Sequence, residues 1–214
     1  KRQIADAKPF YNRSATHKEL EAQYNLRNSS DNDTSTHIPN KSLIRNYAIS
    51  LWATVNPPSL GEKEECMIFR VGRDFATRSD PDNPTYGSPY ISCTANKWKF
   101  VYSNNVLDSS GTIDTKEVSA EYELPYQRWN YIVFNYHDNQ VDLFINGVLR
   151  DTRSLGKHMP QLYYDQVITT GSDTKQIHGA ICEVRVHQEN LGQNDISQSY
   201  NLLKLKNPPV NNLS

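Results

Sequence analysis

The chain has 214 residues, with 23 Lys and Arg, 24 Asp and Glu, and a formal net charge of −1. Because the two kinds of charge nearly balance, the sequence offers no basic surface for nucleic acid or an anionic membrane, and neither partner is expected. The length suffices for one sizeable core, which predicts a single domain with tails.

The sequence contains no membrane or secretion signal. No apolar run approaches the ~20 residues that a membrane-spanning helix needs, and the N-terminus lacks the apolar core of a signal peptide. The chain begins with Lys1 rather than Met, which predicts a processed product or a segment of a longer protein. We therefore expect a soluble chain whose localisation is not encoded in the residues present.

Residues 1–41 are polar and poor in aliphatic side chains, which is typical of an extended arm. Such a segment buries too little apolar surface to order by itself, so we expect a partner to order it. Four N-x-S/T sequons begin in it, at Asn12, Asn28, Asn32 and Asn40. They are either glycosylation acceptors of a secreted protein or chance matches in a segment rich in Asn and Ser.

The first core strand is predicted at residues 47–55, where Leu51 and Trp52 fall on opposite faces of an alternating apolar pattern. Two prolines at 57 and 58 end it, since proline cannot donate to a ladder. Residues 73–89 are rich in Asp, Asn, Pro and Gly, which predicts a surface loop. Further short strands are predicted at residues 66–71, 90–94, 98–102 and 117–124.

The segment 128–153 carries the strongest strand signals. Residues 131–136 are almost all β-branched or aromatic, which favours a strand over a helix. In the next strand Val141, Leu143 and Ile145 recur at period two and so share one face. Asn146-Gly147 supplies the positive φ angles that a two-residue hairpin needs, so residues 148–153 must return antiparallel.

After a crossing loop at 156–165, strands are predicted at 167–172 and 179–186. The one helix is predicted at 194–205, because Ile196, Tyr200 and Leu203 recur at i, i+4 and i+7 behind a capping Asn or Asp. Residues 208–214 form a proline-rich tail. Many short strands with turns between them predict an all-β, antiparallel β-sandwich with one short C-terminal helix and extended polar termini. We expect the helix to pack on the rim of the sandwich.

Two linked motifs resemble laminin-G-like and pentraxin-like domains of the concanavalin A-like lectin and glucanase superfamily. The first runs from Trp129 through the 141–145 strand and its Asn-Gly turn; the second joins the 167–172 and 179–186 segments. The resemblance implies a concanavalin A-like jelly roll over residues 42–207. It also implies a core signature formed by Trp52, Trp129, Val141, Leu143, Ile145, Asn146, Gly147, Gly179 and Val184.

The C-terminal run 201–213, together with the 179–186 segment, resembles concanavalin A-like domains in structural proteins of large DNA viruses of algae and protists. This likeness implies a non-catalytic structural module, a minor capsid or capsid-associated protein assembled in the host cytoplasm, with protein subunits as its partners. The alternative is an extracellular, glycan-binding adhesion module of the lectin type.

Catalysis is not expected from this sequence. Glycanases of the superfamily carry a strand motif of the type E-x-D-x-x-E, which sets two carboxylates ~5 Å apart for a retaining mechanism. The nearest candidates are Glu117, Glu121 and Glu123, and only Glu121 and Glu123 share a strand face. We interpret this pair as a solvated strand edge rather than as an acid and a nucleophile.

No cofactor is predicted, and a calcium site is the alternative that the sequence leaves open. Carboxylates and amides in turns can supply its hard oxygen ligands, but the same residues commonly just set turn geometry; the candidates are Asp80, Asp82, Asn83 and Asp173. A glycan would need exposed aromatic platforms, for which Tyr86, Tyr90, Tyr163 and Tyr164 are candidates. Tyrosine is equally an ordinary core or interface residue.

Three cysteines, Cys66, Cys93 and Cys182, lie singly in apolar runs. This pattern predicts small buried side chains rather than zinc ligands. Their odd number argues against a disulfide framework and fits assembly in a reducing compartment. One bridge, from Cys66 to Cys93, remains open.

Overall fold

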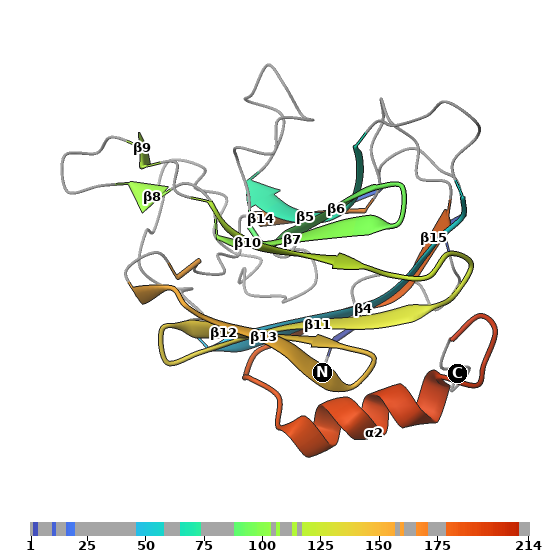
Figure 1. Cartoon of the computed structure of the whole chain (residues 1–214). Coiled ribbons are helices and arrows are strands. Elements are labelled where there is room, and N and C mark those ends of the chain that lie inside the picture. Colours follow the sequence, from blue (N-terminus) through green and yellow to red (C-terminus); the bar gives the residue numbers. More distant parts are fainter. Residues whose placement is uncertain are drawn as a thin grey trace, which may run out of the picture.

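Two antiparallel sheets pack face to face in the computed structural model, and the helix α2 (Gln193–Leu203) lies on the outer face of one of them (Figure 1). This arrangement confirms the predicted β-sandwich with a short C-terminal helix. The structure describes residues 2–3, 10–11, 16–19, 46–57, 65–73, 88–103, 106–107, 113–114, 117–156, 159–160, 166–170 and 179–209.

In the described part of the chain, the first sheet has the order β1-β15-β4-β11-β12-β13, with β2 also pairing with β15. Its central strand β4 therefore has β15 on one side and β11 on the other. The bounds of these strands are β1 (Arg2–Gln3), β2 (Phe10–Tyr11), β4 (Tyr47–Val55), β11 (Asn130–His137), β12 (Gln140–Ile145), β13 (Val148–Ser154) and β15 (Gly179–His187).

The second sheet has the order β10-β7-β6-β5-β14-β3, and a separate two-stranded sheet joins β8 to β9. All neighbouring strands in both sheets are antiparallel. The bounds are β3 (Thr16–Glu19), β5 (Cys66–Arg73), β6 (Tyr90–Thr94), β7 (Lys97–Ser103), β8 (Val106–Leu107), β9 (Ile113–Asp114), β10 (Val118–Glu123) and β14 (Gln166–Thr170).

Every strand predicted from the sequence is present, with bounds that differ by two residues or fewer. Five short strands were not predicted: β1, β2, β3, β8 and β9. The first three fall within the segment 1–41 that is interpreted as an arm, and they pair with β15 and β14 of the sandwich. The division into arm, sandwich and tail stays a prediction.

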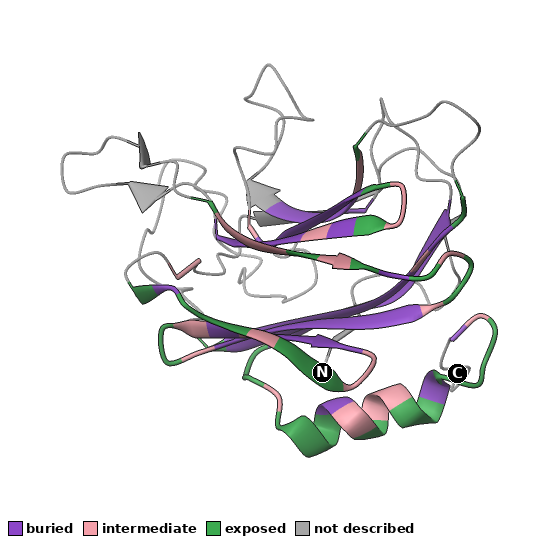
Figure 2. Ribbon diagram, in the orientation of Figure 1, coloured by how far each residue is buried: buried purple, intermediate pink, exposed green. Residues whose placement is uncertain are grey.

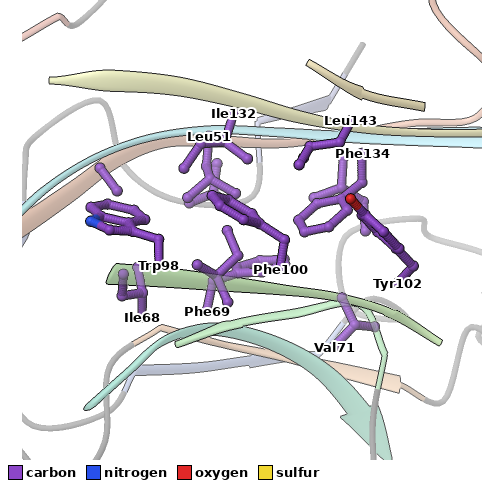
Figure 3. Close-up of a cluster of buried hydrophobic side chains, with 14 of the residues drawn as sticks. Leu51, Ile68, Phe69, Val71, Trp98, Phe100, Tyr102, Ile132, Phe134 and Leu143 are labelled. Atoms are coloured by element: carbon purple, nitrogen blue, oxygen red, sulfur yellow. The ribbon is translucent and has the colours of Figure 1, made fainter. Parts of the chain in front are cut away.

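The main core fills the space between the two sheets (Figure 3). From the first sheet, Leu51, Phe134 and Leu143 point toward Trp98 and Phe100 of the second sheet, and each of these side chains is buried. Their immediate neighbours along each strand point to the opposite face, as the period of two of a strand requires. The core signature residues Val141, Leu143, Ile145 and Val184 all belong to this cluster.

Trp52 lies on the other side of the first sheet. We expected it in or near the main core, but it follows Leu51 directly on β4, so its side chain points to the opposite face. There it is buried in a second cluster that α2 covers, with Tyr131, Phe144 and Ile196. The helix therefore packs on the face of the sheet and not on the rim, which corrects the sequence-based expectation (Figure 2).

The hairpin between β12 and β13 turns at Asn146 (φ 56°) and Gly147 (φ 78°). The Asn146 side chain accepts a hydrogen bond from the Tyr131 backbone N–H at 2.9 Å and donates one to Asn130 Oδ1 at 3.0 Å. Gly147 lies against the Tyr200 ring, and an added Cβ would be 3.2 Å from its Cδ1. The turn therefore supports both its own sheet and the helix beneath it.

The remaining signature positions hold segments together. Gly179 needs its lack of a side chain, because a Cβ there would lie 2.0 Å from the Thr54 carbonyl oxygen. Trp129 donates from Nε1 to Asn207 Oδ1 at 3.0 Å and so attaches the chain after α2 to the sheet.

The expected Asn or Asp cap of the helix is wrong: the N-cap of α2 is Gly192, without a side-chain hydrogen bond.

Replacing Leu143 with Ala should lower the free energy of unfolding by about 2–5 kcal/mol, because the side chain is fully buried between the sheets. Urea unfolding followed by tryptophan fluorescence measures this loss. The control is Val148→Ala at a 54% exposed position, which should stay within about 0.5 kcal/mol of the wild type. Equal losses for the two variants would contradict the register of β12.

Candidate functional site

A small pocket lies between α2 and the outer face of the first sheet. Its volume is about 50 Å³, enough for one polar group. Strands β4, β11 and β15 form its floor, and α2 forms one wall. We call it the helix pocket; its lining consists of Ser50, Trp52, Tyr131, Glu183, Arg185, His187, Ser199, Leu202 and Leu203.

A bulge in β15 brings charge into this pocket. The register of β15 against β4 shifts between Cys182 and Arg185, and Glu183 has a φ of 52°, in the left-handed region. A non-glycine residue held in this region costs of order 1–3 kcal/mol and persists only where its surroundings enforce it. Bulges often re-aim side chains beside functional sites. Here the strained residue is a glutamate whose side chain is 2% exposed.

Arg185 compensates the buried charge of Glu183. Its Nε donates to Glu183 Oε2 at 2.9 Å, and its Nη2 donates to the same oxygen in a shorter contact. The Arg185 side chain is 25% exposed, so the pair reaches from the interior to solvent. A buried carboxylate is tolerated when it is paired in this way.

Hydroxyl groups continue the polar network toward the helix. Ser50 Oγ lies 3.0 Å from His187 Nε2. Burial raises the pKa of Tyr131, and hydrogen bonds with Ser50 and Ser199 partly oppose that rise. The network thus connects β15, β4 and β11 with α2. Because Ser50 is 1% exposed, the Ser50–His187 pair serves as a buried link rather than as an accessible nucleophile and base.

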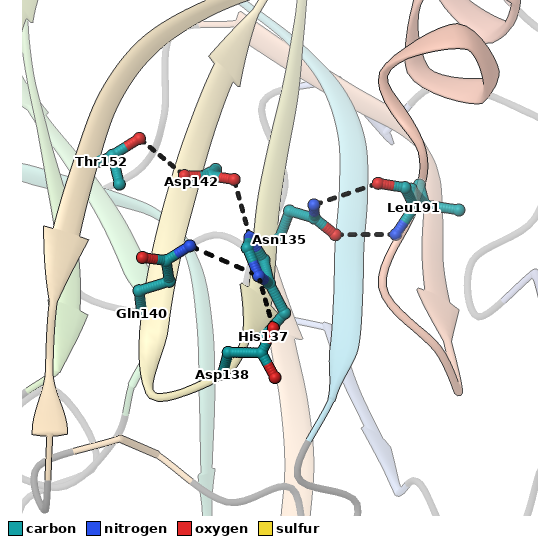
Figure 4. Close-up of polar contacts among 7 residues, drawn as sticks. All are labelled: Asn135, His137, Asp138, Gln140, Asp142, Thr152 and Leu191. Atoms are coloured by element: carbon teal, nitrogen blue, oxygen red, sulfur yellow. Dashed lines mark hydrogen bonds and ion pairs between the residues drawn. The ribbon is translucent and has the colours of Figure 1, made fainter.

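A second polar network lies on β11, β12 and β13 (Figure 4). Asp142 accepts a hydrogen bond from Thr152 Oγ1 at 2.6 Å and lies 2.8 Å from His137 Nε2. The Asn135 amide accepts from the Leu191 N–H at 2.8 Å and donates to the Leu191 carbonyl oxygen at 3.1 Å. The contacts of Asp142 hold β11, β12 and β13 together. The contacts of Asn135 attach the segment before α2 to β11. Both sets of contacts are structural.

The three candidate carboxylates lie at the strand β10 of the second sheet. Glu121 forms an exposed ion pair with Lys97 at 2.5 Å, and Glu123 is exposed. Glu117 lies 2.8 Å from Lys99 Nζ. Burial alone would raise the pKa of Glu117, but hydrogen bonds from Lys99, Ser119 and Tyr90 hold it below its usual value. A group kept ionised in this way is poorly suited to act as a general acid.

The candidate glycan platforms and calcium ligands fall mostly outside the described residues. This applies to Tyr86, Tyr163, Tyr164, Asp80, Asp82, Asn83 and Asp173. Tyr90 is 3% exposed and donates to Glu117 at 3.1 Å, so the expectation of an exposed platform at Tyr90 is wrong. The next residue of β6, Ile91, belongs to the main core, so Tyr90 points to the outer face of the second sheet.

Among the described residues, no group of three or more His, Cys, Asp or Glu side chains is placed to hold a metal ion. Within the same part of the chain, no helix is long and apolar enough to cross a membrane. Cys93 and Cys182 are buried, as predicted, and Cys66 is partly buried.

None of the catalytic or ligand motifs considered in the sequence predicts the helix pocket. The segment from Gly179 to His187 places Glu183, Arg185 and His187 in an otherwise apolar strand. Charged side chains are rarely fully buried unless paired, so their occurrence there is the signal that could have drawn attention to the site. The bulge that brings these side chains together cannot be predicted from the hydrophobic pattern of the strand.

A family model described as the concanavalin A-like lectin/glucanases superfamily matches residues 30–197. No curated protein sequence matches the chain. The fold is similar to solved structures of botulinum neurotoxin binding domains, whose identities with this chain are far too low to show more than the fold.

Three of these structures illustrate the likeness. The serotype D ligand binding domain in complex with N-acetylneuraminic acid is 13% identical, with a TM-score of 0.60 over 87% of this chain and 39% of that chain. The serotype G binding domain is 12% identical, with a TM-score of 0.57 over 91% of this chain and 42% of that chain. The serotype DC binding domain in complex with rat synaptotagmin II is 15% identical, with a TM-score of 0.55 over 77% of this chain and 37% of that chain. This chain spans about two fifths of their length.

Replacing Glu183 with Gln should lower the free energy of unfolding by about 1–3 kcal/mol, because Arg185 loses a charged acceptor in a mostly buried site. Chemical denaturation measures the loss. The matched control, Glu189→Gln at an exposed position near the end of β15, should be almost neutral. If both variants unfold at the same denaturant concentration as the wild type, the ion pair does not stabilise the bulge.

Proposed function

The chain belongs to the concanavalin A-like lectin/glucanases superfamily, and we propose that it is a non-catalytic interaction module that binds another protein. The observation that carries this proposal is the helix pocket. Small-molecule sites usually enclose roughly 300–1,000 Å³, whereas this pocket encloses about 50 Å³. It fits one polar group of a partner's side chain and is too small for a sugar ring.

The lining of the pocket suits a protein partner. Arg185 is 25% exposed and presents its guanidinium beside the paired, buried Glu183, and Ser199 of α2 adds a half-buried hydroxyl. Leu202, at the edge of the pocket, is 60% exposed. Arginine is enriched in protein interfaces and among the residues that contribute most to binding, and apolar side chains form the centre of such interfaces.

We further propose that the partners are protein subunits of a larger assembly, a virion in which the chain is a minor capsid or capsid-associated component. The C-terminal run 201–213 supports this finer proposal through its likeness to structural proteins of large DNA viruses. The odd number of cysteines also fits a chain assembled in the reducing host cytoplasm.

The second candidate is a glycan-binding, lectin-like adhesion module in an extracellular setting. The superfamily includes lectins, and one solved neighbour is in complex with N-acetylneuraminic acid. Of the four candidate tyrosines, Tyr90 is the one among the described residues, and it is buried. The other three candidates lie in residues 74–87 and 161–165.

We expect no hydrolysis of β-glucans or related polymers, because Glu117 and Glu121 form ion pairs with lysines and Glu123 is exposed. Release of reducing sugars from a polysaccharide panel measures this. A turnover that the wild type supports and that disappears in Glu121→Gln or Glu123→Gln would overturn the non-catalytic assignment.

Replacing Leu202 with Asp should reduce association with the native assembly about tenfold, because it places a charge at the edge of the pocket without disturbing a buried side chain. Leu205→Asp is the matched control: Leu205 is 90% exposed and does not line the pocket. Co-sedimentation of the tagged chain with purified assembly measures both variants.

A glycan array run with the same three proteins separates the two candidates. The interaction module should bind no glycan and should lose association only in Leu202→Asp. Glycan binding that both variants retain, with no association to the assembly, would favour the lectin instead.

A further inference from the structure

Cys66 and Cys93 face each other across the β5–β6 ladder. They are direct register partners, and Met67 and Ser92 form the next pair. Directly opposite residues of an antiparallel pair project to the same side of the sheet. Cys93 is part of the main core, and Cys66 packs against that core. The two thiols therefore meet on the inner face of the second sheet, at the end where β5 begins.

The residues before the two cysteines hold this end of the ladder in register. Ser92 Oγ donates a hydrogen bond to Glu65 Oε1 at 2.5 Å, so the residue preceding Cys66 is fastened to the residue preceding Cys93. This contact connects the same two strands as the cysteine pair. It keeps Cys66 opposite Cys93 although β5 has only just begun.

We propose that Cys66 and Cys93 form a disulfide when the folded chain meets a disulfide oxidant such as oxidised glutathione. Opposite residues have Cβ atoms about 4.5–5.5 Å apart, and a disulfide needs about 3.5–4.5 Å. The strands must approach by roughly 1 Å. Cys66 is the first residue of β5, and the ladder already shifts between Met67 and Phe69, so this approach leaves the rest of the sheet in place.

The third cysteine cannot compete for either partner. Cys182 lies on β15 of the first sheet and belongs to the cluster beneath α2, on the far side of that sheet from the main core. Its sulfur lies 4.0 Å from the Pro209 carbonyl oxygen. It serves as a built-in control that should remain a thiol.

The reaction consists of two thiol–disulfide exchanges. The Cys66 thiolate attacks one sulfur of oxidised glutathione, which forms a mixed disulfide and releases one glutathione thiolate. The Cys93 thiolate then attacks the Cys66 sulfur of the mixed disulfide and releases the second. Two protein thiols are oxidised, one glutathione disulfide is reduced to two glutathiones, and the two protons pass to the glutathione thiolates.

Cys66 is the accessible partner and Cys93 the slow one. Cys66 is partly buried, whereas Cys93 is 4% exposed. Burial, with smaller effects of Cys66 and Glu65, raises the pKa of Cys93 to about 12. The thiolate of Cys93 is therefore scarce at neutral pH, and the closing step should accelerate about tenfold for each unit of pH.

The test treats the full chain with oxidised glutathione at pH 8 to 9, stops the exchange with acid, unfolds the chain in denaturant, blocks the remaining thiols with N-ethylmaleimide, and maps the peptides by mass spectrometry. We expect one disulfide, Cys66 to Cys93, with Cys182 alkylated. The oxidised chain should melt at a higher temperature than the reduced chain, because the bridge restricts the unfolded state. Dithiothreitol should reverse both changes.

Variants resolve the order of the steps. Cys93→Ala should stop at the mixed disulfide on Cys66, and Cys182→Ala should close as the wild type does. A wild-type chain that keeps three thiols, holds glutathione stably on Cys66, or forms disulfide-linked dimers would overturn the proposal. The wild-type result decides by itself, so the outcome does not depend on whether Cys93→Ala folds.

Discussion

The strand β4 excludes water from both of its faces, and the rest of the molecule depends on this constraint. Along β4, Leu51 contacts the main core and Trp52 contacts the cluster under α2, and both are buried. A shift of one residue against β11 or β15 would exchange the two sets of side chains. The register of the first sheet is therefore specified twice, once by each core.

The position of α2 follows from the outer face that β4 and β11 present. Trp52 and Tyr131 form an aromatic surface there, and Tyr200 of the helix stacks with Trp52 at 5.8 Å between ring centroids. This apolar contact brings the helix close enough to cover the polar network of β15. The helix pocket lies between α2 and this part of the sheet, where the bulge places Glu183 and Arg185.

The sequence predicted the strands well because each carried a local signal, such as the alternation of Val141 and Leu143 or the turn at Asn146. Three features had no such signal. The short strands β1 to β3 lie in a polar segment and owe their pairing to the open edges of β15 and β14. The bulge at Glu183 depends on the register of two strands distant in sequence. The second core could not be predicted, because the periodicity of the sequence does not specify which face of the sheet α2 covers.

The edge strand β13 is exposed but is protected against pairing with an added strand. Its outward groups could accept an added strand, but Arg150 forms a bulge in the ladder, and charged side chains follow at Asp151 and Arg153. The Tyr122 hydroxyl also donates to the Arg150 carbonyl oxygen at 3.1 Å and occupies that acceptor. Bulges and charges are the devices that protect sheet edges from pairing. Strand addition is therefore disfavoured at β13.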